Sequence, residues 1–172
     1  MKLSPNFDLE EFTWSVVLDK NIEPTDIQIE RIKRLCLNIL QPIRYQFGRV
    51  VITGGLRNAE VYQKLLRKAQ ENRREKGIMT PLPSLRSDHF AGDPMCPQGT
   101  GAADFTTPLA RPDDVFKWIV SQVLPYKQVI FYPDQYFIHI ANAEEGKKAR
   151  REALIYKEGT YSQFHESQEK IL

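Results

Sequence analysis

Apolar residues recur at helical spacing over residues 25–47, in the most regular pattern of the chain. Those on the apolar face are Ile29, Ile32, Leu35, Cys36, Ile39, Leu40 and Ile43. Thr25 and Asp26 precede this face and are candidate N-caps, and Gly48 is a candidate for the C-terminal stop. The pattern therefore predicts a helix over these residues, which Pro42 should kink or end in its first part.

Two further segments have the pattern of amphipathic helices. Asn58 opens one that runs to about Lys76, with a heavily charged face opposite its apolar residues. Arg111 and Pro112 open the other, which has an acidic first turn and apolar residues up to Val123. We expect this second helix to pack on a sheet.

β-Branched and aromatic residues predict strands in three places. The three segments are residues 49–53, 128–132 and 136–140. The first runs into Gly54 and Gly55, which predict a tight turn. The other two flank a three-residue connection and predict a β-hairpin, with His139 on its second strand.

The chain has 172 residues, enough to bury a core within a single domain. We expect residues 1–160 to form this domain. Residues 161–172 are polar and predict a C-terminal tail. No internal repeat or low-complexity tract argues for a second domain.

Composition and charge narrow the possible partners. The chain has 41% hydrophobic and 27% charged residues, which is typical of a soluble globular protein, and no apolar run is long enough to cross a bilayer. The net charge of +2 does not indicate nucleic-acid binding, and the basic segment 64–76 also contains Glu71 and Glu75, which favours a solvated helix face. The first residues lack the apolar region of a secretory signal, so we expect synthesis in the cytoplasm without export.

The chain contains three histidines, so any imidazole-based site must use His89, His139 or His165. His165 lies in the expected tail, whereas His89 and His139 stand beside apolar or small residues, as does Asp104. Two imidazoles and one carboxylate form a typical set of three zinc ligands that leaves a fourth position open for water. We therefore expect these three residues to bind zinc, with hydrolysis as the favoured chemistry.

The two cysteines and two tryptophans are expected to be structural. Cys36 lies on an apolar helical face, and we expect both it and Cys96 to be free thiols. Cys96 falls between two of the expected zinc ligands, so a role as a further ligand stays open. Trp14 and Trp118 are expected in the core rather than at a ligand.

Six short motifs follow one another along the chain. They are Leu3-Ser4-Pro5-Asn6-Phe7-Asp8-Leu9-Glu10-Glu11-Phe12, Leu40-Gln41-Pro42-Ile43-Arg44, Ile52-Thr53-Gly54-Gly55-Leu56-Arg57, Ser87-Asp88-His89-Phe90-Ala91-Gly92, Ala102-Ala103-Asp104 and Ile138-His139. In this order they resemble the zinc D-alanyl-D-alanine carboxypeptidase family, and more narrowly its short, signal-less members encoded by bacteriophages. The resemblance covers residues 3–141, and the combination is more specific than any single motif.

The resemblance implies an α+β fold with a small, mainly antiparallel sheet and helices packed on one side. It implies one zinc ion bound by His89, Asp104 and His139, and peptidoglycan stem peptides as the substrate. By the same match, Arg57 would bind a substrate carboxylate, and Ser87 would form a hydrogen bond near the metal or the substrate. A guanidinium suits this role because it can hold a carboxylate through two parallel hydrogen bonds.

The chain departs from the family in three places. Residues 58–86 and residues 92–101 are longer than the corresponding family segments. Most importantly, Tyr132 occupies the position of the family's general-base glutamate, and loss of a general base commonly costs a factor of about 10² to 10⁴ in rate. Asp134, two residues further on, is the candidate replacement, and Tyr132 itself is a candidate for orienting water or stabilising an oxyanion.

Two functions are therefore open at this stage. The first is an active peptidase that cuts stem peptides, as a lysis enzyme or as a wall-opening part of a phage particle, and so acts on the cell wall after lysis or from a virion. The second is a protein that has lost turnover and binds peptidoglycan or a virion protein. Specific binding to nucleic acid or to a membrane is not expected.

Overall fold

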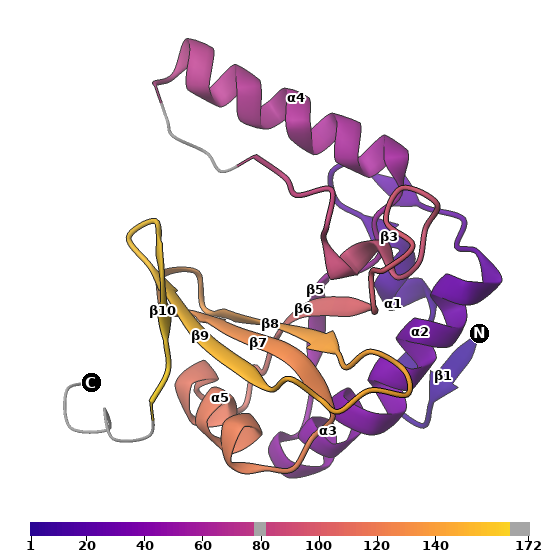
Figure 1. The fold of residues 1–172 in the computed structure, drawn as a ribbon, viewed down its shortest axis with the longest axis vertical. Helices are drawn as coiled ribbons and strands as arrows, with labels where there is room; N and C mark the ends of the chain where they lie inside the picture. The colour runs from indigo at the N-terminus through magenta and orange to yellow at the C-terminus, as the bar shows by residue number, and fades with distance from the viewer. Residues whose placement is uncertain (78–81, 166–172) are drawn as a thin grey trace.

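The centre of the protein is a six-stranded sheet with the strand order β10-β9-β7-β8-β6-β5 (Figure 1). Its strands are β5 (Val51–Gly54), β6 (Ala102–Thr106), β7 (Tyr126–Tyr132), β8 (Phe137–Asn142), β9 (Glu152–Lys157) and β10 (Thr160–Gln163). Neighbouring strands are antiparallel except for β7 and β9, which are parallel. This computed structural model describes residues 1–77 and 82–165, and it confirms the expected α+β class, with a mixed sheet.

The predicted helix over residues 25–47 forms in three connected parts. They are α2 (Asp26–Leu35), the π-helical segment η1 (Cys36–Leu40) and α3 (Gln41–Phe47). Thr25 is the N-cap and forms a reciprocal capping box with Gln28, and Gly48 ends α3 with a φ of 77°. The π-helical segment comes just before Pro42, whose ring lacks an N–H and clashes with the carbonyl four residues earlier, so a wider turn relieves the conflict.

Helices α2, α3 and α5 (Pro112–Ser121) lie against one face of the sheet (Figure 1). Strand residues alternate between the two faces, so every second residue of β6, β7 and β8 points into this helix-covered core. The residues on this helix face are Ala103, Phe105, Val129, Phe131, Ile138 and Ile140. Those on the opposite, open face are Asp104, Gln128, Ile130, Tyr132, Phe137 and His139.

The remaining elements lie outside the central sheet. Helix α4 (Ala59–Glu75) begins after Asn58, as expected, and projects from the body of the protein (Figure 1). Asn58 is its N-cap, because its side chain accepts a hydrogen bond from the Val61 N–H. The N-terminal segment forms α1 (Glu10–Thr13) and two small sheets, which pair β1 (Lys2–Ser4) with β2 (Phe7–Asp8), and β3 (Trp14–Ser15) with β4 (Lys20–Asn21).

The expected C-terminal tail begins inside a strand. Residues 161–163 belong to β10 and pair with β9, and Phe164 is buried against Phe116, so backbone pairing and apolar burial include this segment in the domain. His165 is exposed. The rest of the expected tail, residues 166–172, lies outside the described residues.

The two tryptophans differ in their burial. Trp118 is half-buried and packs edge-on against Phe47, at 5.3 Å between ring centroids. Trp14 is 49% exposed, so its expected place in the core is wrong: the two-residue strand β3 pairs only with β4 and leaves the indole at the surface. Among the described residues, none of the helices combines the length and apolarity that a transmembrane segment needs.

Candidate metal centre

Three side chains converge on the open face of the sheet. Asp104 on β6 and His139 on β8 are direct cross-strand partners, and His89 comes from the short 3₁₀ helix η2 (Asp88–Phe90). Asp104 Oδ1 lies 2.8 Å from His139 Nδ1 and 3.3 Å from His89 Nε2, and the two imidazole nitrogens are 3.2 Å apart. The expected ligand set is therefore brought together.

These three atoms have the spacing of metal ligands. Zinc bonds of about 2.0–2.1 Å in tetrahedral geometry place neighbouring ligand atoms about 3.3 Å apart. The three separations lie close to that value, and the whole group fits within 4.8 Å. The group could therefore hold a metal ion at the floor of a cavity of about 390 Å³.

The second nitrogen of His89 sets the orientation of its ring. Its Nδ1 lies 2.7 Å from the carbonyl oxygen of Gly55, and donation of the N–H to this carbonyl leaves Nε2 free as a ligand. Burial, assisted by Arg57 and His139, lowers the pKa of His89 against the opposing effect of Asp104. Burial alone would raise the pKa of Asp104, but the two imidazoles outweigh it and hold that pKa below its usual range. Both groups are thus in the deprotonated form that metal ligands require.

The tight turn predicted at Gly54 and Gly55 does not form, because Gly54 is the last residue of β5 and extended chain follows, but the two glycines bring backbone close to the centre. A Cβ atom at Gly54 would lie 2.5 Å from Asp104 Oδ2, and one at Gly55 would lie 2.2 Å from the carbonyl oxygen of Phe12. The next residue, Leu56, donates its N–H to the same Phe12 carbonyl at 2.7 Å. Only glycine leaves room for these approaches.

Gln28 supports the centre and was not expected from the sequence. Its buried side chain donates from Nε2 to the carbonyl oxygen of Phe90 at 2.9 Å and to that of Arg57 at 3.3 Å. The Arg57 N–H in turn donates to the His89 carbonyl at 2.9 Å. The Thr-x-x-Gln spacing that starts at Thr25 indicates the capping box. It does not indicate that the Gln28 side chain also bonds to backbone carbonyls beside the metal centre.

Arg57 and Ser87 both line the cavity above the metal centre. Arg57 Nη1 donates to Ser87 Oγ at 3.4 Å. Burial lowers the pKa of Arg57, with Asp104 and Tyr132 acting against it, but a guanidinium stays charged in proteins. Arg57 therefore presents a positive charge beside the candidate metal position.

The two candidate replacements for the family glutamate lie in different environments. Tyr132 lines the cavity, stacks on Phe137 with ring centroids 4.3 Å apart, and has its hydroxyl 3.4 Å from that of Tyr161. Burial raises the pKa of Tyr132, so its hydroxyl stays protonated. Asp134 is exposed in the 3₁₀ turn η3 (Pro133–Gln135) and does not line the cavity.

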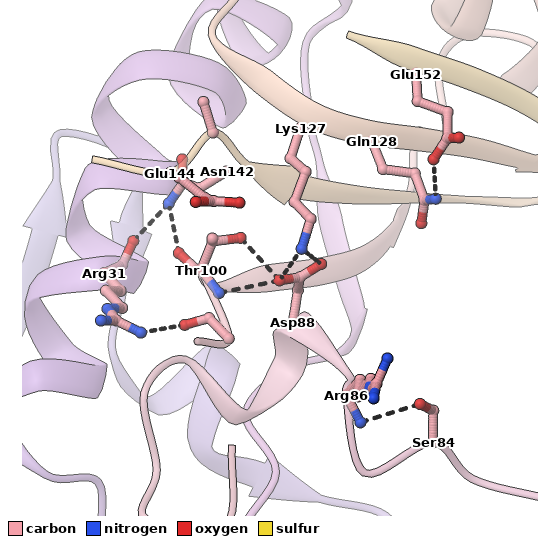
Figure 2. Close-up of polar contacts among 12 residues, drawn as sticks. Arg31, Ser84, Arg86, Asp88, Thr100, Lys127, Gln128, Asn142, Glu144 and Glu152 are labelled. Carbon is pink, nitrogen blue, oxygen red and sulfur yellow. Dashed lines mark hydrogen bonds and ion pairs between the residues drawn. The ribbon is translucent and has the colours of Figure 1, made fainter. Parts of the chain in front are cut away.

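A polar network joins the long segment 92–101 to Asp88, the residue just before His89 (Figure 2). Both carboxylate oxygens of Asp88 lie 2.9 Å from Lys127 Nζ, and Oδ1 also accepts from the backbone N–H and the hydroxyl of Thr100 at 3.0 Å. Segment 92–101 is therefore anchored directly beside the ligand His89. Cys96 within it is buried and free, as is Cys36, and Cys96 is not part of the metal-ligand group.

Taken together, the centre offers two imidazoles and one carboxylate, an adjacent guanidinium and a wall that carries the Ser87 and Tyr132 hydroxyls. The three metal-ligating groups could hold an ion in an open cavity, and the Arg57 guanidinium beside them could bind the carboxylate of a second molecule. Comparisons of this chain with known protein families, with curated proteins and with solved structures give no match.

Proposed function

We propose that this chain is a zinc-dependent peptidase that hydrolyses peptidoglycan stem peptides, as a D,D- or L,D-carboxypeptidase or endopeptidase. The observation that carries the proposal is the near-tetrahedral spacing of His89, Asp104 and His139 at the floor of a cavity that Arg57 also lines. Two imidazoles and one carboxylate favour zinc over magnesium or calcium, which prefer all-oxygen sites.

Besides the three metal ligands, three residues of the cavity have a role in this proposal: Arg57, Ser87 and Tyr132. When bound, zinc would supply Lewis-acid chemistry, polarising a peptide carbonyl and activating water. Arg57 binds the substrate carboxylate, and Ser87 orients the guanidinium through its hydroxyl. Tyr132 keeps its proton and therefore acts as a hydrogen-bond donor towards the substrate rather than as a base.

One observation favours a second candidate function, binding of peptidoglycan or of a virion protein without turnover. Among the described residues that line the cavity, the carboxylates are Asp88 and Asp104. Asp88 is engaged by Lys127 and Thr100, and Asp104 by the two imidazoles. Neither is free to act as the general base that the family glutamate provides.

In either case we propose that the protein meets the cell wall after lysis or from a phage particle. Its ligand there is a stem peptide or, for the second candidate function, peptidoglycan or a virion protein, and neither a specific nucleic acid nor a membrane is part of the proposal.

The deciding experiment treats purified peptidoglycan with the zinc-loaded protein and measures released D-alanine and small muropeptides by liquid chromatography and mass spectrometry. His89→Ala removes one ligand, and His165→Ala is the matched control because His165 is exposed and outside the centre. We expect release by the parent and by His165→Ala, and none by His89→Ala.

The outcomes separate the two candidate functions. Release that survives His89→Ala would contradict a metallopeptidase. Zinc binding with no release, together with sedimentation of the protein with the peptidoglycan, would support the binding function instead.

A further inference from the structure

Four aromatic side chains, one from each of four neighbouring strands, form a row across the open face of the sheet. This aromatic row consists of Phe137 on β8, Tyr132 on β7, Tyr156 on β9 and Tyr161 on β10. Phe137 is the cross-strand partner of Tyr132, and Tyr156 is that of Tyr161. The parallel register pairs Phe131 with Ile155, so Tyr132 and Tyr156 come next to each other. Ring centroids along the row are 4.3, 5.2 and 4.7 Å apart.

The aromatic row starts beside the metal centre. Phe137 lies two residues before the ligand His139 on β8, so both side chains point to the open face. Phe137, Tyr132 and Tyr161 also line the cavity above the metal centre. The row crosses three strand spacings, which is about 14 Å, and ends on β10, the last strand of the sheet (Figure 1). It therefore extends the cavity from the metal centre to the edge of the sheet.

The outer end of the row is open to solvent. Phe137, Tyr132 and Tyr156 are half-buried, whereas Tyr161 is 54% exposed. Cross-strand aromatic contacts stabilise a sheet, but they do not require an exposed outer ring. Exposed aromatic rings that continue a polar cavity are typical of a binding surface.

The chemistry of the row favours a saccharide over a peptide. Because the ring centroids are only 4.3–5.2 Å apart, no peptide side chain can insert between the rings, and they offer a surface rather than separate pockets. A sugar ring has an apolar C–H face, which can lie on an aromatic ring, and hydroxyl groups around its edge. The hydroxyls of Tyr132 and Tyr161, which are 3.4 Å apart, can form hydrogen bonds with that edge.

We propose that the aromatic row is a saccharide-binding subsite, which holds the glycan part of peptidoglycan while its peptide lies at the metal centre. This inference rests on the proposed function. Tyr132, which stands where the family has its glutamate, is a central member of the row. Tyr156 and Tyr161 follow residue 141, so the row extends beyond the part of the chain that resembles the carboxypeptidase family. The substrate class is thus a peptide still attached to its glycan strand rather than a free peptide.

Binding of a peptide-free sugar tests the inference directly. The full chain, with and without zinc, is titrated with tri-N-acetylglucosamine while the backbone amide shifts are followed by NMR. We expect saturable shifts in β9 and β10 in both cases, because none of the four members of the row belongs to the metal-ligand group. Free N-acetyl-D-Ala-D-Ala is the second probe, and its shifts should lie at the metal centre instead.

Matched tyrosine variants test the place of binding. Tyr161→Ala removes the most exposed ring of the row, whereas Tyr45→Ala removes a 72% exposed tyrosine of α3 that does not line the cavity. We expect Tyr161→Ala to weaken trisaccharide binding about three- to tenfold and Tyr45→Ala to leave it unchanged. Tyr161→Phe keeps the ring and should retain most of the binding. The amide spectrum of each variant reports whether its fold is retained.

The outcomes separate the subsite from the proposed function. Absence of trisaccharide binding, or equal binding by the parent and Tyr161→Ala, overturns the subsite even if D-alanine is released from peptidoglycan. Weaker binding of the peptide instead of the trisaccharide in Tyr161→Ala would assign the row to a peptide and also overturn the subsite. Trisaccharide binding that depends on Tyr161, without release of D-alanine or muropeptides, supports the subsite and counts against peptidase turnover.

Discussion

The two faces of the central sheet are built from the same strands, but one face forms the apolar core and the other carries the polar candidate site. On the helix face, residues such as Phe105 and Ile138 are fully buried in the core. On the open face, the cross-strand partners Asp104 and His139 belong to the group that could hold a metal ion. A strand with a period of two can thus build a core and a site at once, and a one-residue shift in register would exchange them.

The two faces contribute to two different free energies, that of folding and that of metal binding. Burial of apolar area on the helix face stabilises the folded state. On the open face, polar groups are held close together for an ion, which contributes binding free energy rather than packing. We therefore expect substitutions on one face to change stability and substitutions on the other to change metal affinity, as the following variants test.

Phe105→Ala should give the largest effect. It leaves a cavity in the helix-face core, and loss of a buried phenylalanine costs about 3–5 kcal/mol in the free energy of unfolding. Urea denaturation of the metal-free protein measures this cost. A loss below about 1 kcal/mol would show that the helix face is not the main core.

Asp104→Asn changes the adjacent residue on the same strand but on the open face. Because it removes the anionic ligand, we expect zinc affinity to fall by more than about 100-fold, beyond the effect of losing an outer partner. Isothermal titration with zinc gives the affinity, and tight binding by this variant would contradict the assigned ligand set.

Gly54→Ala tests the close approach of backbone to the carboxylate. The new methyl group would lie 2.5 Å from Asp104 Oδ2, so the carboxylate must move. We expect zinc affinity to fall by about 10- to 100-fold, as when an orienting contact is lost. Thr53→Ala, at the exposed neighbouring position, is the control and should bind zinc like the parent.

Gln28→Ala tests support from the helix layer. It leaves the carbonyl groups of Phe90 and Arg57 without their side-chain donor, at a cost of about 1–3 kcal/mol in unfolding free energy. Gln135→Ala, an exposed glutamine in the η3 turn, serves as the control. Equal stability of the two variants would show that the Gln28 bridge contributes nothing.

Asp134→Asn should have the smallest effect. Asp134 is exposed and lies outside the cavity lining, so zinc affinity and any release of muropeptides should match the parent within about twofold. A clear loss of release with unchanged zinc affinity would return Asp134 to the role of general base.

Local patterns in the sequence predicted much of the fold. The helix over residues 25–47, its cap at Thr25, the hairpin that carries His139 and the helix that starts at Asn58 are all present. These features depend on hydrophobic period, capping and turn chemistry, which act over a few residues. The convergence of His89, Asp104 and His139 was expected from residue types and from the order of motifs.

Other features depend on contacts between residues far apart in the chain. The reach of Gln28 to Phe90 joins a helix to a loop 62 residues later, and no local pattern indicates it. The exposure of Trp14 likewise depends on which segments pack nearby.

The sequence by itself determined which residue types the centre has and that His139 lies on a strand, because period and propensity are local properties. Only the tertiary structure decided that Tyr132 lines the cavity while Asp134 does not, and that the Asp104 carboxylate packs closely against Gly54. The physical reason is that side-chain direction and close packing follow from strand register and from the approach of distant backbone segments, which no single segment specifies.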